Sequence, residues 1–94
     1  MPNVIRFHIE IEGKVQGVFF RHTAQKIAQS LGLTGWVKNA GEKVICEAQG
    51  EQVLVEQFIL FALHGPRLST VEKVLLEPME PFAREEEFSI VDAY

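Results

Sequence analysis

Residues 5–12 alternate strictly between apolar and polar side chains, and this pattern limits the possible folds more than any other feature. The apolar positions are Ile5, Phe7, Ile9 and Ile11, separated by basic, acidic and histidine residues. Because successive side chains of a strand point to opposite faces, the pattern predicts a β-strand with one buried face. Such a strand belongs in a sheet that is covered on one side.

Two later segments have apolar residues at helical spacing. The first stripe, ended by Gly32, consists of Phe20, Ala24, Ile27, Ala28 and Leu31. The second lies in residues 51–64, stops at Gly65-Pro66, and consists of Leu54, Val55, Phe58, Phe61 and Ala62. We therefore predict two amphipathic helices.

The remaining β-prone segments are short. Residues 33–39 and 43–49 are joined by Ala-Gly-Glu, which predicts a hairpin. Residues 69–77 predict a strand with a bulge or irregular start, because two of its valines are three positions apart. A loop with Pro78 and Pro81 then leads to a short strand over residues 88–91. The order βαββαβ predicts an α+β, ferredoxin-like sandwich: an antiparallel sheet, two helices on one face and a short C-terminal strand.

Composition excludes several classes of protein. With 94 residues, 47% of them hydrophobic, the chain is expected to form one domain over residues 1–94. Its only cysteine, Cys46, cannot form an intramolecular disulfide, and no apolar run suits a signal peptide or a membrane span. These features predict a cytoplasmic domain without a membrane partner. The oligomeric state is left open by the sequence, with a monomer as the default expectation. A net charge of −4 with scattered Lys and Arg disfavours nucleic-acid binding, so an anion would need a local positive site.

The segment Gly13-Lys-Val-Gln-Gly-Val-Phe-Phe-Arg21 joins the first predicted strand to the first predicted helix. A loop at a helix N-terminus presents unpaired backbone N–H groups, and the helix dipole adds positive charge there. Gly17 permits close approach of an oxyanion, and Arg21 can donate two hydrogen bonds to it. A nucleotide P-loop is excluded, because Val15 stands where Ser or Thr would follow the lysine. The residues alone leave an alternative open, in which the glycines only turn the chain and Arg21 is solvated.

This segment resembles the first signature of the acylphosphatase family, G-x-V-Q-G-V-x-F-R, at every fixed position. Further along, Gly35-Trp36-Val37-Lys38-Asn39 resembles the start of that family's second signature: glycine, aromatic residue, valine, basic residue and asparagine. Residues 44–50 match the tail of the second signature. The predicted elements also cover the whole chain as the fold of that family does.

The resemblance implies a hydrolase that cleaves the carboxyl–phosphate bond of small acyl phosphates. In that family the loop arginine and loop amides bind the phosphate, and the strand asparagine orients the attacking water. By position, the catalytic residues are Arg21 and Asn39, and the substrate-binding residues are Gln16, Gly17, Val18, Phe19, Phe20 and Arg21. Since phosphoryl transfer depends mainly on positioning and charge stabilisation, we expect neither a metal nor a cofactor. Inorganic phosphate or sulfate is expected to bind at the loop.

One departure from the family pattern follows the asparagine. Family members usually have three residues and then Gly-x-Val, whereas the segment from Asn39 to Val44 is one residue shorter. A one-residue change in a hairpin can alter the turn type or the pairing. The placement of Asn39 is therefore the least constrained part of the predicted site, and by itself this residue also suits a strand end before a turn.

The histidines and the cysteine lack metal-ligand spacing. His8 is expected on the polar face of the first strand, and His64 in the last turn of the second helix. His22 borders Arg21 and can alter the charge of the site. Cys46 lies on the same face of its predicted strand as apolar neighbours two positions away, which predicts an unreactive, buried thiol.

Two other functions are alternatives to hydrolysis. A non-catalytic anion-binding module would keep the loop without turnover, as the acylphosphatase-like domain of hydrogenase-maturation proteins shows that the fold can serve in larger assemblies. RNA binding on the sheet would need a basic and aromatic strand motif, which the chain lacks. Phe19, Phe20 and Trp36 are instead predicted to pack in the core, and the acidic residues 85–87 to be solvated.

Overall fold

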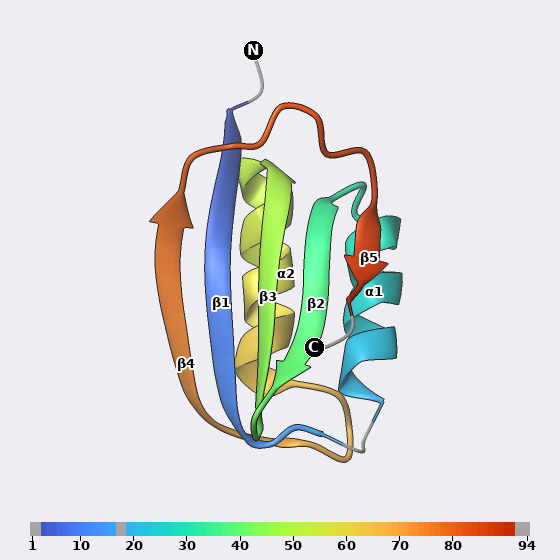
Figure 1. Cartoon of the computed structure of the whole chain (residues 1–94), viewed down its shortest axis with the longest axis vertical. Coiled ribbons are helices and arrows are strands. Elements are labelled where there is room, and N and C mark those ends of the chain that lie inside the picture. The colour runs from blue at the N-terminus through green and yellow to red at the C-terminus, as the bar shows by residue number, and fades with distance from the viewer. Residues whose placement is uncertain (1–2, 17–18, 92–94) are drawn as a thin grey trace.

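The computed structural model describes residues 3–16 and 19–91, which form five strands and two helices (Figure 1). In chain order these are β1 (Val4–Lys14), α1 (Phe20–Ser30), β2 (Thr34–Ala40), β3 (Lys43–Glu51), α2 (Gln52–His64), β4 (Thr70–Met79) and β5 (Phe88–Ile90). The strands form one sheet in the order β4-β1-β3-β2-β5. The predicted ferredoxin-like α+β fold is confirmed. No helix in the described part of the chain is long and apolar enough to cross a membrane.

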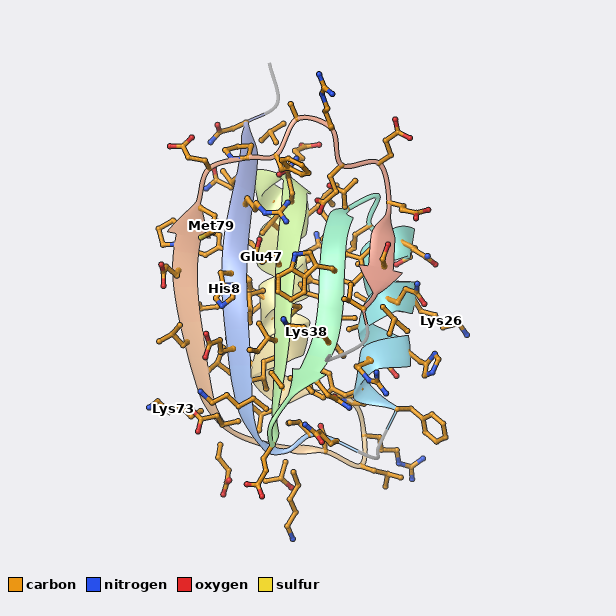
Figure 2. The ribbon with its side chains drawn as sticks, in the orientation of Figure 1. His8, Lys26, Lys38, Glu47, Lys73 and Met79 are labelled. Atoms are coloured by element: carbon orange, nitrogen blue, oxygen red, sulfur yellow. The ribbon has the colours of Figure 1, made fainter. Side chains whose placement is uncertain are left out.

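The first four strands form the predicted antiparallel sheet, and the C-terminal strand adds to its edge. β1 pairs antiparallel with β3 and β4, and β2 pairs antiparallel with β3. β5 pairs in parallel with β2, so the complete sheet is mixed. Both helices lie on one face of this sheet, and the opposite, open face carries His8 and Glu47 (Figures 1 and 2).

The core lies between the helices and the covered face of the sheet. Alternate residues of β1 and β3 supply Ile9, Ile11, Val44, Cys46 and Ala48, all 0% exposed. The predicted helical stripes meet them through residues that are also buried: Phe20, Ala24 and Ala28 of α1, and Val55, Phe58 and Ala62 of α2. Burial raises the pKa of the Cys46 thiol to about 12, which agrees with the prediction of an unreactive cysteine.

The first residue of α1 anchors that helix in the core. The Phe20 ring is 2% exposed and lies 5.5 Å, between ring centroids, from Phe61 of α2. The start of α1 is therefore fixed by apolar packing and not by a capping side chain, since none bonds its first turn. This fixes the helix N-terminus at the end of the sheet where the β1–α1 loop lies.

The predicted irregularity of residues 69–77 is a bulge between β1 and β4. Glu12 pairs with Lys73 and Gly13 with Val71, so one extra residue lies on β4. Gly13 has a φ of 136°, and a Cβ there would overlap the carbonyl oxygen of Thr70. The first glycine of the signature thus has a structural explanation, namely the close approach of β4.

The prediction that Pro78 lies in a loop is wrong. β4 continues to Met79, and Pro78 pairs with Phe7 of β1. β4 is an edge strand, where a residue without an N–H group is tolerated because one side of the strand needs no donor.

Residues 80–87, which we call the crossing segment, run from the β4 edge to the β5 edge (Figure 1). The Arg6 guanidinium, on a residue only 5% exposed, donates to both carboxylate oxygens of Glu85 at 2.7 and 3.2 Å. Gln49 exchanges two hydrogen bonds with the Phe82 backbone, at 2.6 and 3.0 Å. The expectation that residues 85–87 form a solvated edge is therefore wrong for Glu85, because a buried arginine requires an acidic partner.

The aromatic residues divide between core and surface, which corrects another expectation. Phe20 is buried as predicted, but Phe19 is 76% exposed. Trp36 is half-buried on the open face, where Lys38 Nζ lies 5.4 Å from the centre of its ring. Phe19 is the N-cap residue that precedes α1, and Trp36 lies on the face of β2 opposite to Val37, so neither side chain is directed into the core.

His8 lies between two carboxylates on the open face. Its Nδ1 is 2.8 Å from Glu47 Oε2 and its Nε2 is 3.0 Å from Glu10 Oε2. Only the doubly protonated ring can donate to both oxygens. Burial by itself lowers the pKa of His8, but the hydrogen bonds to Glu10 and Glu47 and the two negative charges outweigh it and raise this pKa.

We expect the free energy of unfolding to depend on pH through this group. The His8 contribution is complete below the ordinary histidine pKa of 6.5 and is lost as pH rises through the raised, folded-state pKa. The pKa values of Glu10 and Glu47 are lowered, so their contribution is complete above 4.5 and is lost as pH falls through the folded-state values. The group therefore stabilises the fold most between pH 4.5 and 6.5.

Denaturant unfolding from pH 4 to 9 measures this dependence. In the parent, the free energy of unfolding should fall by about 0.5–1 kcal/mol as pH rises through the raised pKa of His8, which is the scale of a partly exposed ion pair. This fall should be absent in His8→Gln. His64→Gln, at an exposed histidine in the last turn of α2, is the matched control and should keep the parental profile. Identical alkaline profiles for the parent and His8→Gln would contradict the assignment.

Candidate functional site

The two signature segments meet at one end of the sheet. The β1–α1 loop and the turn between β2 and β3 both lie at the end shown at the bottom of Figure 1. β1 and β2 are not neighbours in the sheet, since β3 separates them. Because β3 is antiparallel to both, β1 and β2 run in the same direction and finish at the same end of the sheet.

A cavity of about 220 Å³ lies between these segments. Its lining includes the predicted residues that the structure describes: Gln16, Phe19, Phe20, Arg21 and Asn39. The other two, Gly17 and Val18, lie outside the described residues. The fold thus brings Arg21 and Asn39 to one cavity, although they are far apart in the sequence.

The N-terminus of α1 makes this cavity electropositive. No side chain caps the first turn, and no acidic residue lies in it. The first backbone N–H groups of a helix have no partner within the helix, and its dipole places about half a positive charge there. None of the described residues that line the cavity is acidic, and Arg21 adds a full positive charge. Within residues 3–16 and 19–91, no hydrogen bond or ion pair is found for the Arg21 guanidinium, so its N–H groups can donate to an anion.

Asn39 contributes an unusual polar atom to the site. It is the last residue but one of β2 and has the same parity as the buried Gly35 and Val37, so its side chain belongs to the helix-covered face. Its Oδ1 is buried and has no hydrogen-bond partner among the described residues. Since nearly all buried polar atoms are hydrogen-bonded, an unsatisfied acceptor beside a cavity indicates a place for a bound donor, such as water.

The shortened connection after Asn39 forms a regular two-residue turn. Ala40 pairs with Lys43, which leaves Gly41 and Glu42 in the turn, and Gly41 has a φ of 62°. A positive φ at this position is typical of tight hairpin turns and favours glycine. Asn39 pairs with Val44, so regular strand pairing continues past Asn39 as far as the turn.

The Gln16 side chain links the β1–α1 loop to this turn. Its Nε2 donates to the carbonyl oxygens of Gly41 at 2.7 Å and Lys43 at 2.9 Å. The sequence indicated Gln16 only for its backbone amide and missed this side-chain link. No local pattern predicts it, because the acceptors are backbone atoms of a distant turn.

Val15 and His22 complete the cavity lining. Val15 is 1% exposed and packs in the core, whereas His22 is exposed and its ring centroid lies 6.5 Å from that of Phe19. Among the described residues, no group of three or more His, Cys, Asp or Glu side chains is arranged to hold a metal ion.

Comparisons with known proteins agree on one family. A family model described as Acylphosphatase matches residues 7–90. An acylphosphatase of Acaryochloris marina is 44% identical over 75 residues, which are 79% of this chain and 81% of that relative. The crystal structure of acylphosphatase from Bacillus subtilis is 31% identical with a TM-score of 0.88, over 93% of this chain and 98% of that chain.

A third similar structure is much larger. Full-length HypF, in a phosphate- and nucleotide-bound form, is 33% identical with a TM-score of 0.88. The match covers 97% of this chain but only 12% of HypF. A domain of this fold therefore also occurs as a small part of a longer protein.

Proposed function

Because this chain belongs to the acylphosphatase family of hydrolases, we propose that it cleaves the carboxyl–phosphate bond of small acyl phosphates without a metal ion. Arg21 and the amides from Gln16 to Arg21 hold the phosphate, and Asn39 orients the water that attacks phosphorus. The observation that carries this proposal is that Arg21 and Asn39 line one and the same cavity at the N-terminus of α1. Hydrolysis of benzoyl phosphate in the presence of EDTA tests it.

The equatorial oxygens of the phosphate group carry negative charge, which nearby positive groups and N–H donors must stabilise. The Arg21 guanidinium can donate two parallel hydrogen bonds to these oxygens, and the first amides of α1 add further donors. The water oxygen forms a bond to phosphorus while the bond from phosphorus to the acyl oxygen breaks. The leaving group departs as a carboxylate, which is stable without protonation, so no general acid is needed. The proton released from water goes to the phosphate product or to solvent.

Asn39 places the water and does not deprotonate it. A side-chain amide oxygen accepts a hydrogen bond but is too weak a base to remove the proton. The unpartnered Oδ1 supports this role, since it can accept a hydrogen bond from water. Correct placement of two reactants can supply several kcal/mol of the barrier reduction, about 7–11 kcal/mol at best.

Gln16 is proposed to set the separation of the two catalytic segments. Its link to Gly41 and Lys43 ties the loop that precedes Arg21 to the turn that follows Asn39. We expect Gln16→Ala to lower kcat by about tenfold to a hundredfold, because a displacement of about 1 Å at a reacting centre can have such an effect. Steady-state kinetics with benzoyl phosphate gives this value.

A double-mutant cycle separates this role from a general loss of stability. In an Asn39→Ala background, Gln16→Ala should cause little further loss, about twofold or less, because the two residues act on the same water placement. Additive losses would contradict the link. Gln57→Ala, at an exposed glutamine of α2, is the matched control and should keep the parental rate.

Three further predictions accompany the proposal. Inorganic phosphate and sulfate should inhibit competitively, since both are tetrahedral anions that fit the loop. The chain is expected to be a monomer, which sedimentation measures. A cytoplasmic location stays a prediction of the sequence.

A further inference from the structure

Phe19 combines three features that packing does not explain. Its side chain is 76% exposed, although exposed aromatic rings contribute little to folding. Its backbone has φ 59° and ψ 27°, and it is the one residue other than glycine with a positive φ in residues 3–16 and 19–91. It also lines the cavity that holds Arg21 and Asn39. A left-handed backbone is unfavourable for an aromatic residue, and such positions are common at ligand-binding sites.

The acyl group of a bound substrate must lie on one side of the phosphate. In an in-line displacement the attacking water and the leaving oxygen are on opposite sides of phosphorus. Given the proposed function, on which this inference rests, the water lies at Asn39. The acyl group therefore leaves the phosphate on the side away from Asn39.

Among the described residues of the cavity, Phe19 is the apolar side chain with free surface to meet an acyl group. The apolar lining consists of Val15, Phe19 and Phe20, and of these Val15 is 1% exposed and Phe20 is 2% exposed. The Phe19 ring is accessible, and the exposed His22 ring lies near it, at 6.5 Å between centroids and an interplanar angle of 53°. An aromatic acyl group could pack against both rings in the tilted arrangements that aromatic pairs prefer.

We propose that Phe19 and His22 form a subsite for the acyl group, and that this subsite favours aromatic acyl phosphates over those with a short aliphatic acyl group. Arg21 and the loop amides bind the phosphate group, which every substrate has in common. Contact with the Phe19 ring then removes apolar surface of an aromatic acyl group from water, whereas an acetyl group is too small to gain as much.

The test compares kcat/KM for benzoyl phosphate and acetyl phosphate. Phe19→Asn is the main variant, because asparagine tolerates the left-handed backbone and removes the ring. We expect the benzoyl-to-acetyl ratio of kcat/KM to fall by about fivefold to tenfold, mainly through KM for benzoyl phosphate, since an aromatic pair of this kind changes binding by such factors. Phe19→Tyr should keep the parental ratio.

Phe82→Ala is the matched control. Phe82 is also an exposed phenylalanine, 59% exposed, but it lies in the crossing segment and not at the cavity. This variant should leave both rates and their ratio unchanged. An unchanged ratio in Phe19→Asn, with a parent that hydrolyses both substrates, would overturn the subsite alone. A parent that hydrolyses neither substrate would overturn the proposed function and the subsite together.

Discussion

Replacement of Arg21 by alanine is expected to lower kcat/KM for benzoyl phosphate by about two to three orders of magnitude, the usual effect of removing a main group that stabilises transition-state charge. Among the described residues that line the cavity, Arg21 is the one cationic side chain other than histidine. The amides at the start of α1 would remain, so some activity should persist. Arg21→Lys should also lose activity, because an ammonium group is a point charge and cannot donate two parallel hydrogen bonds.

The measurement compares the parent and Arg21→Ala in EDTA. Arg84→Ala is the matched control, since Arg84 is an exposed arginine of the crossing segment and does not line the cavity. EDTA should leave the parental rate unchanged. Equal rates for the parent and Arg21→Ala would refute the assignment of Arg21. Phosphate binding to a parent that hydrolyses no acyl phosphate would favour the non-catalytic, anion-binding module.

The second large effect is expected for Asn39→Ala, which should lower kcat by about two to three orders of magnitude while KM changes little. In the proposed mechanism, loss of the side chain removes the acceptor that orients the water but leaves Arg21 and the helix N-terminus to bind the phosphate. Asn39→Asp should be at least as impaired, because a carboxylate would be repelled by the phosphate dianion.

The same substitution should not weaken the fold. Asn39 Oδ1 is buried without a partner among the described residues, and removal of an unsatisfied polar atom is neutral or stabilising. We therefore expect the Tm of Asn39→Ala to equal or exceed that of the parent, while inorganic phosphate still inhibits with parental affinity. Asn3→Ala, at an exposed asparagine, serves as the control for activity. A lowered Tm, or a weaker phosphate affinity with unchanged kcat, would show that Asn39 has another role.

Local patterns were sufficient to predict most elements of this fold. The alternation over residues 5–12 corresponds to β1, and the stripe from Phe20 to Leu31 corresponds to α1 and its end. The spacing of Val71 and Val74 indicated the bulge against Gly13. These predictions succeed because the periods of strands and helices fix which side chains share a face before any tertiary contact forms.

The same patterns could not identify long-range partners. Phe19 and Phe20 are adjacent phenylalanines, yet one is exposed at the cavity and the other is buried against Phe61. Both were predicted to pack in the core. They differ because Phe19 precedes α1, whereas Phe20 is its first residue. The prediction of a solvated acidic edge was wrong for Glu85 for a similar reason, because this carboxylate is the partner of the buried Arg6.

The sequence by itself determined the order of the elements, their buried faces and the two signature segments that carry Arg21 and Asn39. Only the tertiary structure decided that Gln16 reaches Gly41 and Lys43, that Asn39 keeps an unpartnered oxygen, and that Phe19 stays exposed beside them. The physical reason is that periodicity depends on neighbours along the chain. Contacts across the sheet depend instead on strand register and on where a helix docks, and these are fixed by packing of the whole core.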